Sequence, residues 1–386
     1  MLSYPRLPWS ADELPERLRP VIEKYRDEAD ELRRLPHELV GELRAAGAFR
    51  FSTPAELGGF ELPLAAGADL VERLARLDGP IAWIVWNLNV GFSAAVLAES
   101  RVAEVWAGGP DPLIAHSSQP GFLVPDGDGF RLSGQWKLVS GVEAAEWVAL
   151  LGVVVDGGQP RMTETGPDLR FCLVPRSSVT VHDTWHPSGM RGTNSNSVTA
   201  QDVLVAADLT VTFAAPARID RPLYRVPVPN QISAGGAAVV LGIARAAIDE
   251  VVRLSHAKTG PDGVAMALQP RLQAVVGQAS AQLDAARALL LSTVGALDAA
   301  AVADRPATEA ERGAVRGALA HAAETARTVL TAMYQAGSSS ALPEASRLAR
   351  LFRDGHTAAQ HAMMAPAQYE VAGRTVLGVP AGDPSL

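Results

Sequence analysis

Apolar residues in the first third of the chain recur every three or four positions, the spacing that places them on one face of an α-helix. Stripes of this kind run over residues 12–32 and 36–47, and the second ends at a glycine, which readily adopts the left-handed conformation that closes a helix. Two more helical stretches follow over 65–77 and 82–99. The pattern therefore predicts a helical N-terminal domain, to which we assign residues 1–109.

The pattern changes near Pro110, where turn-forming residues become dense and the apolar segments become short. Segments rich in β-branched and aromatic residues are separated by tight turns, and none of the connections carries a helical stripe. This arrangement favours an antiparallel β-barrel or sandwich over a parallel doubly wound sheet, and we assign it residues 110–215. The expected strands cover residues 130–138, 147–155, 171–174, 179–181 and 198–205.

The helical spacing returns near Asn230 and persists into the C-terminal region. A stripe of apolar residues over 272–297 predicts one long helix, and further helices are expected over 306–334 and 343–369. Long, alanine-rich helices of this kind pack closely, so residues 216–386 are predicted to form a four-helix bundle.

The composition limits the classes of function. The 386 residues carry a formal net charge of −8 and no block of Lys and Arg, which argues against nucleic acid or an anionic membrane as a partner. The longest apolar run, residues 232–248, is interrupted by Arg245 and is expected to be a buried helix rather than a membrane span. Cys172 is the single cysteine, so no internal disulfide forms, and with no signal-peptide pattern a cytoplasmic location is expected. The excess of Ala and Arg over Lys is typical of a GC-rich bacterial genome.

Three strings stand in the order expected of one enzyme superfamily. They are Phe51-Ser-Thr-Pro-Ala-Glu-Leu-Gly-Gly59, Leu132-Ser-Gly-Gln-Trp-Lys-Leu-Val-Ser-Gly141 and Trp185-His-Pro-Ser-Gly-Met-Arg-Gly-Thr-Asn-Ser-Asn-Ser197, the last followed by Asp202-Val-Leu-Val205. Together with the order of helices, strands and helices, they resemble the acyl-CoA dehydrogenase superfamily. The resemblance implies an α+β fold in which an N-terminal helical domain, a central antiparallel β-barrel or sandwich and a C-terminal four-helix bundle enclose a flavin.

The superfamily contains two main chemistries, and the C-terminal third of the chain separates them. Its dehydrogenases use a glutamate base, but the C-terminal position for that base shows none, and the alternative position aligns with Asn230 and Gln231, which are not bases. The strings Gln335-Ala-Gly-Ser-Ser-Ser340, Arg347-Leu-Ala-Arg-Leu-Phe-Arg-Asp-Gly-His-Thr-Ala-Ala-Gln-His361 and Gly373-Arg-Thr-Val-Leu-Gly378 instead resemble the two-component flavin-dependent monooxygenase (hydroxylase) branch. That branch takes reduced flavin, FMN or FAD, from a separate reductase, forms a C4a-hydroperoxyflavin with O2, and inserts one oxygen atom into a small organic substrate.

The resemblance implies two catalytic residues. Ser140 is the hydroxyl expected beside flavin N5, and His361 is the group expected to manage one proton, a task that suits imidazole because its ordinary pKa lies near neutral pH. The branch commonly has a second histidine in its N-terminal helices, but Gly91 stands at the aligned position in this chain. Asn87 or Asn89 can supply a hydrogen bond there, although neither can carry a proton.

Further residues are expected to bind the cofactor or to line the substrate pocket. For the substrate, an aromatic or polyketide-like compound or an amino sugar, the expected pocket comprises Trp86, Asn89, Phe92 and His361. The turn at 336–340 is expected to reach the flavin of a neighbouring subunit in a homotetramer or homodimer. The residues implied for flavin binding are Ser117, Ser118, Gln119, Trp136, Ser140, Gly141, Arg191, Thr193, Ser195, Lys258, Ser338 and Ser339.

Other patterns carry no chemistry of their own. His356 and His361 are five residues apart, a poor spacing for a shared metal on a helix, so no metal site is expected. Arg350 and Asp354 are interpreted as an ion pair on a helix surface, and His116 has no partner that the sequence identifies. Two alternatives to the monooxygenase stay open: an FAD-dependent dehydrogenase acting on an acyl thioester, and a catalytically silent oligomeric scaffold.

Overall fold

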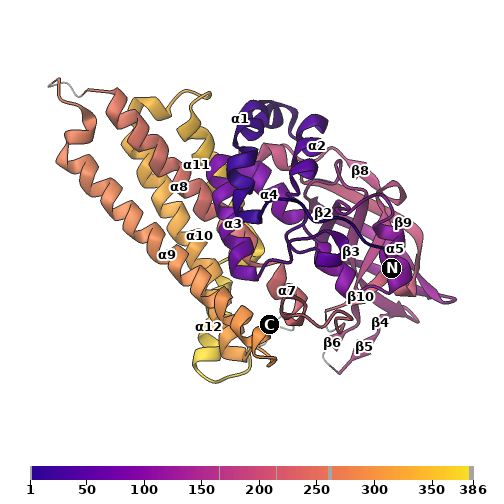
Figure 1. Ribbon diagram of the computed structural model, residues 1–386. Coiled ribbons are helices and arrows are strands. Elements are labelled where there is room, and N and C mark those ends of the chain that lie inside the picture. Colours follow the sequence, from indigo (N-terminus) through magenta and orange to yellow (C-terminus); the bar gives the residue numbers. More distant parts are fainter. Residues whose placement is uncertain (1, 165, 214, 260–262, 382–386) are drawn as a thin grey trace.

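The computed structural model describes residues 2–381 apart from 165, 214 and 260–262. Helices occupy the chain up to Val105 and again from Pro222, and the strands lie between Ile114 and Thr212. The long helices form a bundle at one side of the molecule and the strands form a sheet at the other, with the N-terminal helices between the two (Figure 1). The predicted order of helices, strands and helices is confirmed.

The N-terminal helices each bury an apolar face, and α4 is almost wholly enclosed. Asp78 caps α4 by accepting a hydrogen bond of 3.1 Å from the backbone N–H of Ile81, and every residue of this helix except Trp86 is buried. α3 packs along the bundle and α4 follows it directly, so α4 is held at the centre of the molecule. The five helices are α1 (Leu14–Leu32), α2 (His37–Ala46), α3 (Leu64–Leu77), α4 (Gly79–Asn87) and α5 (Glu99–Val105).

The single helix expected over residues 82–99 is wrong. α4 ends at Asn87, a 3-10 turn follows at Gly91–Ala95, and α5 begins only at Glu99. The break falls where Asn87, Asn89 and Gly91 alternate with apolar residues, because asparagine and glycine favour turns over helix interiors. As a result, two buried asparagines lie inside the protein at the break: Asn87 is the last residue of α4, and Asn89 lies in the turn that follows.

Eight strands form one sheet in the order β10-β7-β3-β1-β2-β9-β8, with β4 beside β3. The pairs are antiparallel as predicted, except that β1 and β3 pair in parallel, so the sheet is mixed. β2 turns back from β1 as a hairpin, and the chain then crosses to the other edge of β1, so β3 runs in the same direction as β1. The strands are β1 (Ile114–Asp126), β2 (Gly129–Val139), β3 (Trp147–Asp156), β4 (Gln159–Pro160), β7 (Leu169–Pro175), β8 (Thr180–His182), β9 (Asn196–Ala206) and β10 (Thr210–Thr212), with β5 (Met162–Thr163) and β6 (Gly166–Pro167) paired separately.

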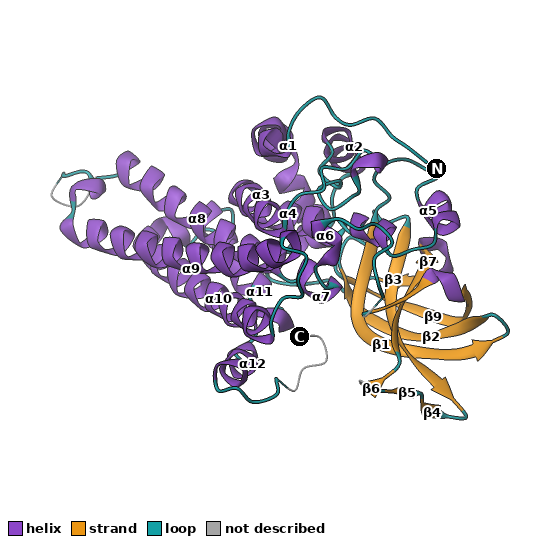
Figure 2. Ribbon diagram, turned by 60° about the horizontal axis from the view of Figure 1, so that its bottom comes forward, coloured by secondary structure: helices purple, strands orange, loops and turns teal. Residues whose placement is uncertain are grey.

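The bundle consists of long helices that run away from the sheet (Figure 2). Two stretches of the described chain are long and apolar enough to cross a membrane, Val228–Ala257 and Pro270–Val302. In the first, 83% of the most apolar window is buried inside the protein, which confirms the predicted buried helix; in the second, 33% is buried. After the short α6 (Pro222–Arg225) and α7 (Val228–Gln231), the helices are α8 (Ala234–Ala257), α9 (Pro270–Val302), α10 (Glu309–Gly337), α11 (Arg347–Ala358) and α12 (Ala367–Val376).

The single C-terminal helix expected over 343–369 is also wrong. α11 ends at Ala358 and α12 begins at Ala367, with a 3-10 turn, Ala362–Met364, between them. Pro366 accounts for part of the break, because a proline disfavours helical conformation in the residue before it, and Ala365 is extended. His361 therefore lies in the break between two helices, where it caps the 3-10 turn.

The interpretation of Arg350 and Asp354 as a surface ion pair is wrong as well. The Arg350 side chain is 16% exposed, and Asp354 is buried. Arg350 Nη2 lies 3.0 Å from Asp78 Oδ2, and Asp354 Oδ1 accepts a hydrogen bond of 2.5 Å from the backbone N–H of Met190. This cluster ties α11 to the start of α4 and to the segment before β9, so it joins the bundle, the N-terminal helices and the sheet.

Candidate active site

Ser140 lies at a tight turn directly after β2. The next residue, Gly141, has a φ of +74°, and a Cβ built on it would lie 3.1 Å from the side chain of Leu88 on the adjoining turn. The backbone N–H of Gly141 donates a hydrogen bond of 2.8 Å to the carbonyl oxygen of Thr193. Glycine is required here by both conformation and space, and the turn holds Ser140 against the segment that leads into β9.

Ser140 is the first member of a chain of buried hydroxyl groups. Its Oγ lies 2.7 Å from Ser195 Oγ, which lies 2.7 Å from Thr193 Oγ1, and Thr193 Oγ1 donates to the carbonyl oxygen of Met190 at 2.9 Å. Because each hydroxyl has one hydrogen, the last bond sets the direction of the others: Ser195 donates to Thr193, and Ser140 donates to Ser195. The indole Nε1–H of Trp83 donates to Ser140 Oγ at 3.3 Å. Ser140 therefore has its hydrogen engaged and keeps one lone pair for a further donor.

Trp83 also connects Ser140 with His361. The ring centroids of Trp83 and His361 are 5.6 Å apart in an edge-to-face arrangement, and those of Trp86 and His361 are 6.3 Å apart. The Nδ1 atom of His361 accepts a hydrogen bond of 3.3 Å from the backbone N–H of Met363, so the neutral imidazole carries its hydrogen on Nε2. Burial lowers the pKa of His361. At neutral pH this side chain is therefore a neutral donor.

Two small adjoining cavities, of about 40 and 70 Å³, lie between the N-terminal helices, the sheet and the start of α8. Trp86 and Asn89 line the first, and Phe92 lines both. A Cβ on Gly235 of α8 would lie 2.1 Å from Trp86 Cδ1, so the absence of a side chain there allows the indole its position against the cavity. His361 meets this space through its contact with Trp86. The residues that line both cavities are Val90, Phe92, His116 and Ile232.

Asn87 and Asn89, at the end of α4, differ in whether their side-chain amides are already hydrogen-bonded. Asn89 Nδ2 donates to the carbonyl oxygen of Ala48 at 2.8 Å, and its Oδ1 accepts from the backbone N–H and the hydroxyl of Ser52, each at 3.2 Å. Asn87 Oδ1 is buried without a hydrogen-bond partner among the described residues, and Asn87 lines the first cavity. The amide of Asn89 is thus occupied by the protein, whereas Asn87 has an acceptor to offer.

Strand β1 is bulged between Ser117 and Gly121, where its register with β3 shifts. Ser117 is buried and donates to the carbonyl oxygen of Lys137 at 3.1 Å, whereas Ser118 and Gln119 are exposed. Gln119 Oε1 accepts a hydrogen bond of 3.1 Å from the backbone N–H of Lys137. The bulge therefore presents a hydroxyl, an amide and backbone groups at the surface of the sheet domain.

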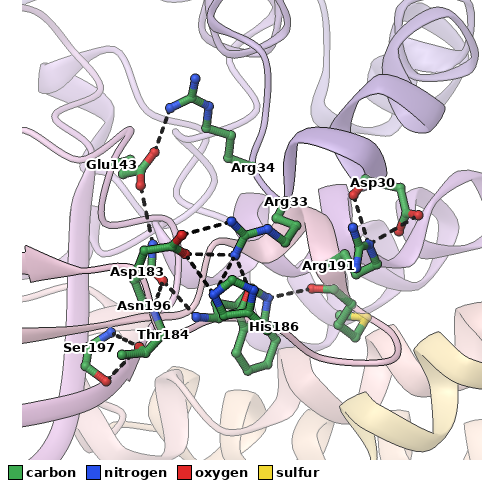
Figure 3. A network of polar contacts seen from close by, with 12 residues as sticks. Asp30, Arg33, Arg34, Glu143, Asp183, Thr184, His186, Arg191, Asn196 and Ser197 are labelled. Carbon is green, nitrogen blue, oxygen red and sulfur yellow. Dashed lines mark hydrogen bonds and ion pairs between the residues drawn. The ribbon is translucent and has the colours of Figure 1, made fainter.

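The segment from Trp185 to Ser197 packs against the C-terminal end of α1 (Figure 3). Arg191 Nε donates a hydrogen bond of 3.1 Å to the carbonyl oxygen of Asp30, and in Figure 3 its guanidinium lies beside that residue. Arg33 Nη1 lies 2.8 Å from Asp183 Oδ1 in the same network. The structure thus turns Arg191 toward α1, and its expected contact with a flavin phosphate stays a prediction.

Lys258 and the turn that contains Ser338 and Ser339 meet at one end of the bundle. Lys258 Nζ contacts Ser340 Oγ, and Ser338 and Ser339 are exposed beside it. This end of α8 and α10 points away from the sheet in both views (Figures 1 and 2). The structure brings these residues together with each other but not with Ser140 of the same chain.

The groups around Ser140 suit the polar edge of a flavin ring. Ser140 offers a lone pair to a ring N–H, and His361 offers an N–H to an oxygen atom. The exposed bulge of β1 adds Ser118 and Gln119, which can both donate and accept. Trp136, by contrast, is fully buried in the sheet domain, where its Nε1 donates to a backbone carbonyl at 2.8 Å.

His116 is a candidate to which the sequence analysis assigned no role. Burial, and to a smaller extent the nearby His361, lowers the pKa of His116 to about 4, and a hydrogen bond with the backbone of Asn87 offsets part of that effect. Its Nδ1 is buried without a hydrogen-bond partner among the described residues. The one signal in the sequence was its place directly before Ser117, in a segment expected to face the flavin.

Comparisons with known proteins cover nearly the whole chain. Residues 11–100 match the acyl-CoA dehydrogenase N-terminal domain, and residues 234–366 match the acyl-CoA dehydrogenase C-terminal domain. A pigment production hydroxylase of Rhodococcus sp. is 30% identical over 391 aligned positions, which cover 97% of this chain and 98% of that protein.

Two further likenesses concern the cofactor. The oxygenase component of an FADH(2)-dependent resorcinol hydroxylase of Rhizobium sp. is 29% identical over 71% of this chain and 70% of that protein. The solved structure of XiaF from Streptomyces sp. in complex with FADH2 and glycerol superimposes with a TM-score of 0.90 at 26% identity, covering 97% of this chain and 98% of that one.

Proposed function

This chain belongs to the acyl-CoA dehydrogenase superfamily and is one of its flavin-dependent monooxygenases, which use reduced flavin and O2, and on that premise we propose that Ser140 and His361 are its catalytic pair. The observation that carries the proposal is their connection through Trp83, whose Nε1–H donates to Ser140 Oγ and whose ring contacts the imidazole. Both residues therefore contact the same indole, which supports a shared role.

Reduced flavin, when bound, supplies the electrons with which O2 delivers one oxygen atom to the substrate. The hydroxyl chain makes Ser140 an acceptor, because its own hydrogen is donated to Ser195. An acceptor at this point suits reduced flavin, whose N5 carries a hydrogen, better than oxidised flavin, whose N5 is itself an acceptor. The direction of these hydroxyl hydrogen bonds therefore favours binding of reduced flavin over oxidised flavin. Ser117, Ser118, Gln119, Gly141, Thr193 and Ser195 support the ring directly or by positioning Ser140.

His361 holds a proton at Nε2 and donates it in a hydrogen bond. The backbone N–H of Met363 fixes Nδ1 as the acceptor, so protonation of Nδ1 would cost this bond. Oxygen activation also needs a space from which water is excluded. Trp83 is buried at 8% exposure and packs edge to face against Trp86 at a centroid distance of 4.9 Å, so two indoles shield the imidazole.

The lining of the cavities supports a small aromatic substrate. Apolar and aromatic side chains, among them Trp86 and Phe92, dominate the walls, and a few polar groups fix orientation, as in most small-molecule sites. Asn87 supplies an acceptor that suits a ring hydroxyl or N–H. The resorcinol hydroxylase, by its name, acts on a phenol. We therefore assign a planar aromatic compound with a hydrogen-bond donor as the substrate class.

The Rhizobium relative is named as an oxygenase component, which implies a separate reductase as its partner. We propose a flavin reductase as the partner of this chain as well. We further propose a homotetramer or homodimer in which Lys258, Ser338 and Ser339 reach the flavin of a neighbouring subunit. The end of α8 and α10 beside which these residues lie points away from the sheet, which supports this arrangement. A bacterial source, a cytoplasmic location, the use of FMN or FAD, and domains at 1–109, 110–215 and 216–386 complete the proposal.

The test measures flavin binding first and oxygenation second. Reduced and oxidised FMN and FAD are titrated into the protein under nitrogen, and we expect the reduced forms to bind more tightly, with the preference weakened in Ser140→Ala. Reductase, NADH, phenol and ¹⁸O2 are then added, and the product is expected to carry one labelled atom. Failure to bind reduced flavin would favour the scaffold, and reduction of an artificial acceptor without use of O2 would favour the dehydrogenase.

A further inference from the structure

Position 91 has no room for a side chain. A Cβ built on Gly91 would lie 2.0 Å from Thr53 Oγ1 and 2.8 Å from Thr53 Cα. Thr53 is itself buried at 1% exposure, in a loop that packs against the end of α4. A side chain at position 91 would have to displace this loop, because Thr53 occupies the space beside Gly91.

His116 reaches the same region from the sheet. It lies on β1 opposite Ala149 of β3, and its side chain lines both cavities together with Val90 and Phe92, the two neighbours of Gly91. An imidazole from the strand therefore enters the space that flanks position 91.

Several polar atoms of the first cavity have no hydrogen-bond partner among the described residues. They are His116 Nδ1, Asn87 Oδ1 and Gln231 Oε1, and all three residues line that cavity. A buried polar atom without a partner destabilises a protein by about 1–3 kcal/mol, so three in one cavity need an explanation. A bound molecule with hydrogen-bond donors would satisfy them.

His361 also affects His116. A proton on His361 would oppose protonation of His116, and His116 forms a hydrogen bond with the backbone of Asn87. The indole of Trp86 lines the first cavity and also contacts His361. Trp86 thus connects the cavity that His116 lines with His361.

We propose that His116, together with Asn87, binds the ring hydroxyl or N–H of the aromatic substrate. This inference rests on the proposed function and assigns the group that recognises the substrate. The O–H or N–H of the substrate donates a hydrogen bond to Nδ1 of His116, which polarises that bond and leaves more electron density on the oxygen or nitrogen atom attached to the ring. The ring becomes more electron-rich as a result. Reduced flavin and O2 provide the two electrons and the oxygen atom, and the second oxygen atom leaves as water.

The test compares two probes on the flavin-free protein. Phenol has a hydroxyl donor and anisole has none, and their binding is followed by tryptophan fluorescence. We expect wild-type protein to bind phenol about 10-fold more tightly than anisole, the size of one hydrogen bond in a dry site. His116→Phe and the polar His116→Gln should both lose this preference with little change for anisole. His182→Gln is the matched control, since His182 lies on β8 and bonds to Thr199 outside both cavities.

The inference would be overturned if wild-type protein bound phenol no more tightly than anisole, or if a variant at position 116 kept the preference for phenol. These measurements use neither flavin nor O2, so they are separate from the oxygenation assay. If wild-type protein formed no labelled product in that assay, the proposed function alone would be refuted. In the complete system, His116→Gln is expected to lower the product formed per O2 consumed and to change its pH profile, while reduced flavin binds as in wild-type protein. A purely structural role for His116 would leave that pH profile unchanged.

Discussion

Replacing His116 with glutamine should make the stability of the protein less sensitive to acid. The pKa of His116 is lowered from 6.5 to about 4 in the folded protein, and the unfolded chain regains the ordinary value. Between these values the unfolded state binds a proton that the folded state does not. The stability contributed by this group is therefore fully present above its unfolded pKa and is lost as the pH falls through its folded pKa.

The structure sets the size of the effect. The difference 6.5 − 4 gives about 2.5 pH units, which corresponds to roughly 3 kcal/mol at about 1.4 kcal/mol per unit. Near pH 5 roughly 2 kcal/mol of this has been lost, because the unfolded imidazole is then mostly protonated and the folded one is mostly neutral. Glutamine has no such titration. Burial also raises the pKa of Asp354 to about 7, but this carboxyl is present in both proteins and cancels in the comparison.

The assay is urea unfolding of wild-type protein and His116→Gln, followed by tryptophan fluorescence at about pH 7.5 and about pH 5. The difference in free energy of unfolding between the two proteins should move by roughly 2 kcal/mol in favour of the variant at the lower pH. The measurement near neutral pH gives the constant offset that the substitution itself causes. If the difference moved by less than about 0.5 kcal/mol, the lowered pKa of His116 in the folded protein would be refuted.

Three further outcomes follow from the geometry. Ser140→Ala breaks the hydroxyl chain and should weaken binding of reduced flavin by about 10-fold under nitrogen, with unfolding stability as the control for folding. His361→Gln should lower product per O2 by at least about 10-fold and raise hydrogen peroxide, since the shielded donor is altered; unchanged coupling would rule out its assigned role. Gly91→Ala should destabilise the protein by about 1–3 kcal/mol, and Thr53→Gly should relieve much of that loss when the two are combined.

The order of helical and strand regions could be predicted because each buries one face at a regular spacing. The apolar stripe over 272–297 lies within α9, and the glycine at 47 caps α2 in the left-handed conformation as expected. The chain direction within the sheet could not be predicted in the same way. Whether β3 joins β1 in parallel depends on which edge the chain returns to, and periodicity along one strand does not contain that information.

The first strand escaped prediction for a related reason. Its polar run, Ser117 to Pro120, interrupts the apolar alternation, and a bulge absorbs the interruption. His116 stands directly before that run, so its inward orientation became visible only with the register against β3. The helix break that holds His361 was obscured by alanines, which suit a helix equally well on either side of the break.

The connection of Ser140 with His361 is a matter of tertiary packing. Neither spacing nor composition places the indole of Trp83 between them, because the three residues come from α4, the turn after β2 and the break after α11. Of the residues expected in the substrate pocket, Trp86, Asn89 and Phe92 line the first cavity, and the amide of Asn89 is engaged by Ala48 and Ser52. Residue identity gave no indication of which asparagine would have a free acceptor.

The tie between Arg350, Asp78, Asp354 and the backbone of Met190 bears on how molecules enter and leave. Separating the bundle from the sheet would leave buried charged groups of this cluster without their partners, which is strongly unfavourable. We therefore expect opening and closing in short segments at the cavity walls, such as α7, where the Gln231 side chain donates to the neighbouring carbonyl oxygen of Val226. Molecules are thus expected to enter and leave through local movement at the cavity wall, while the bundle and the sheet stay together.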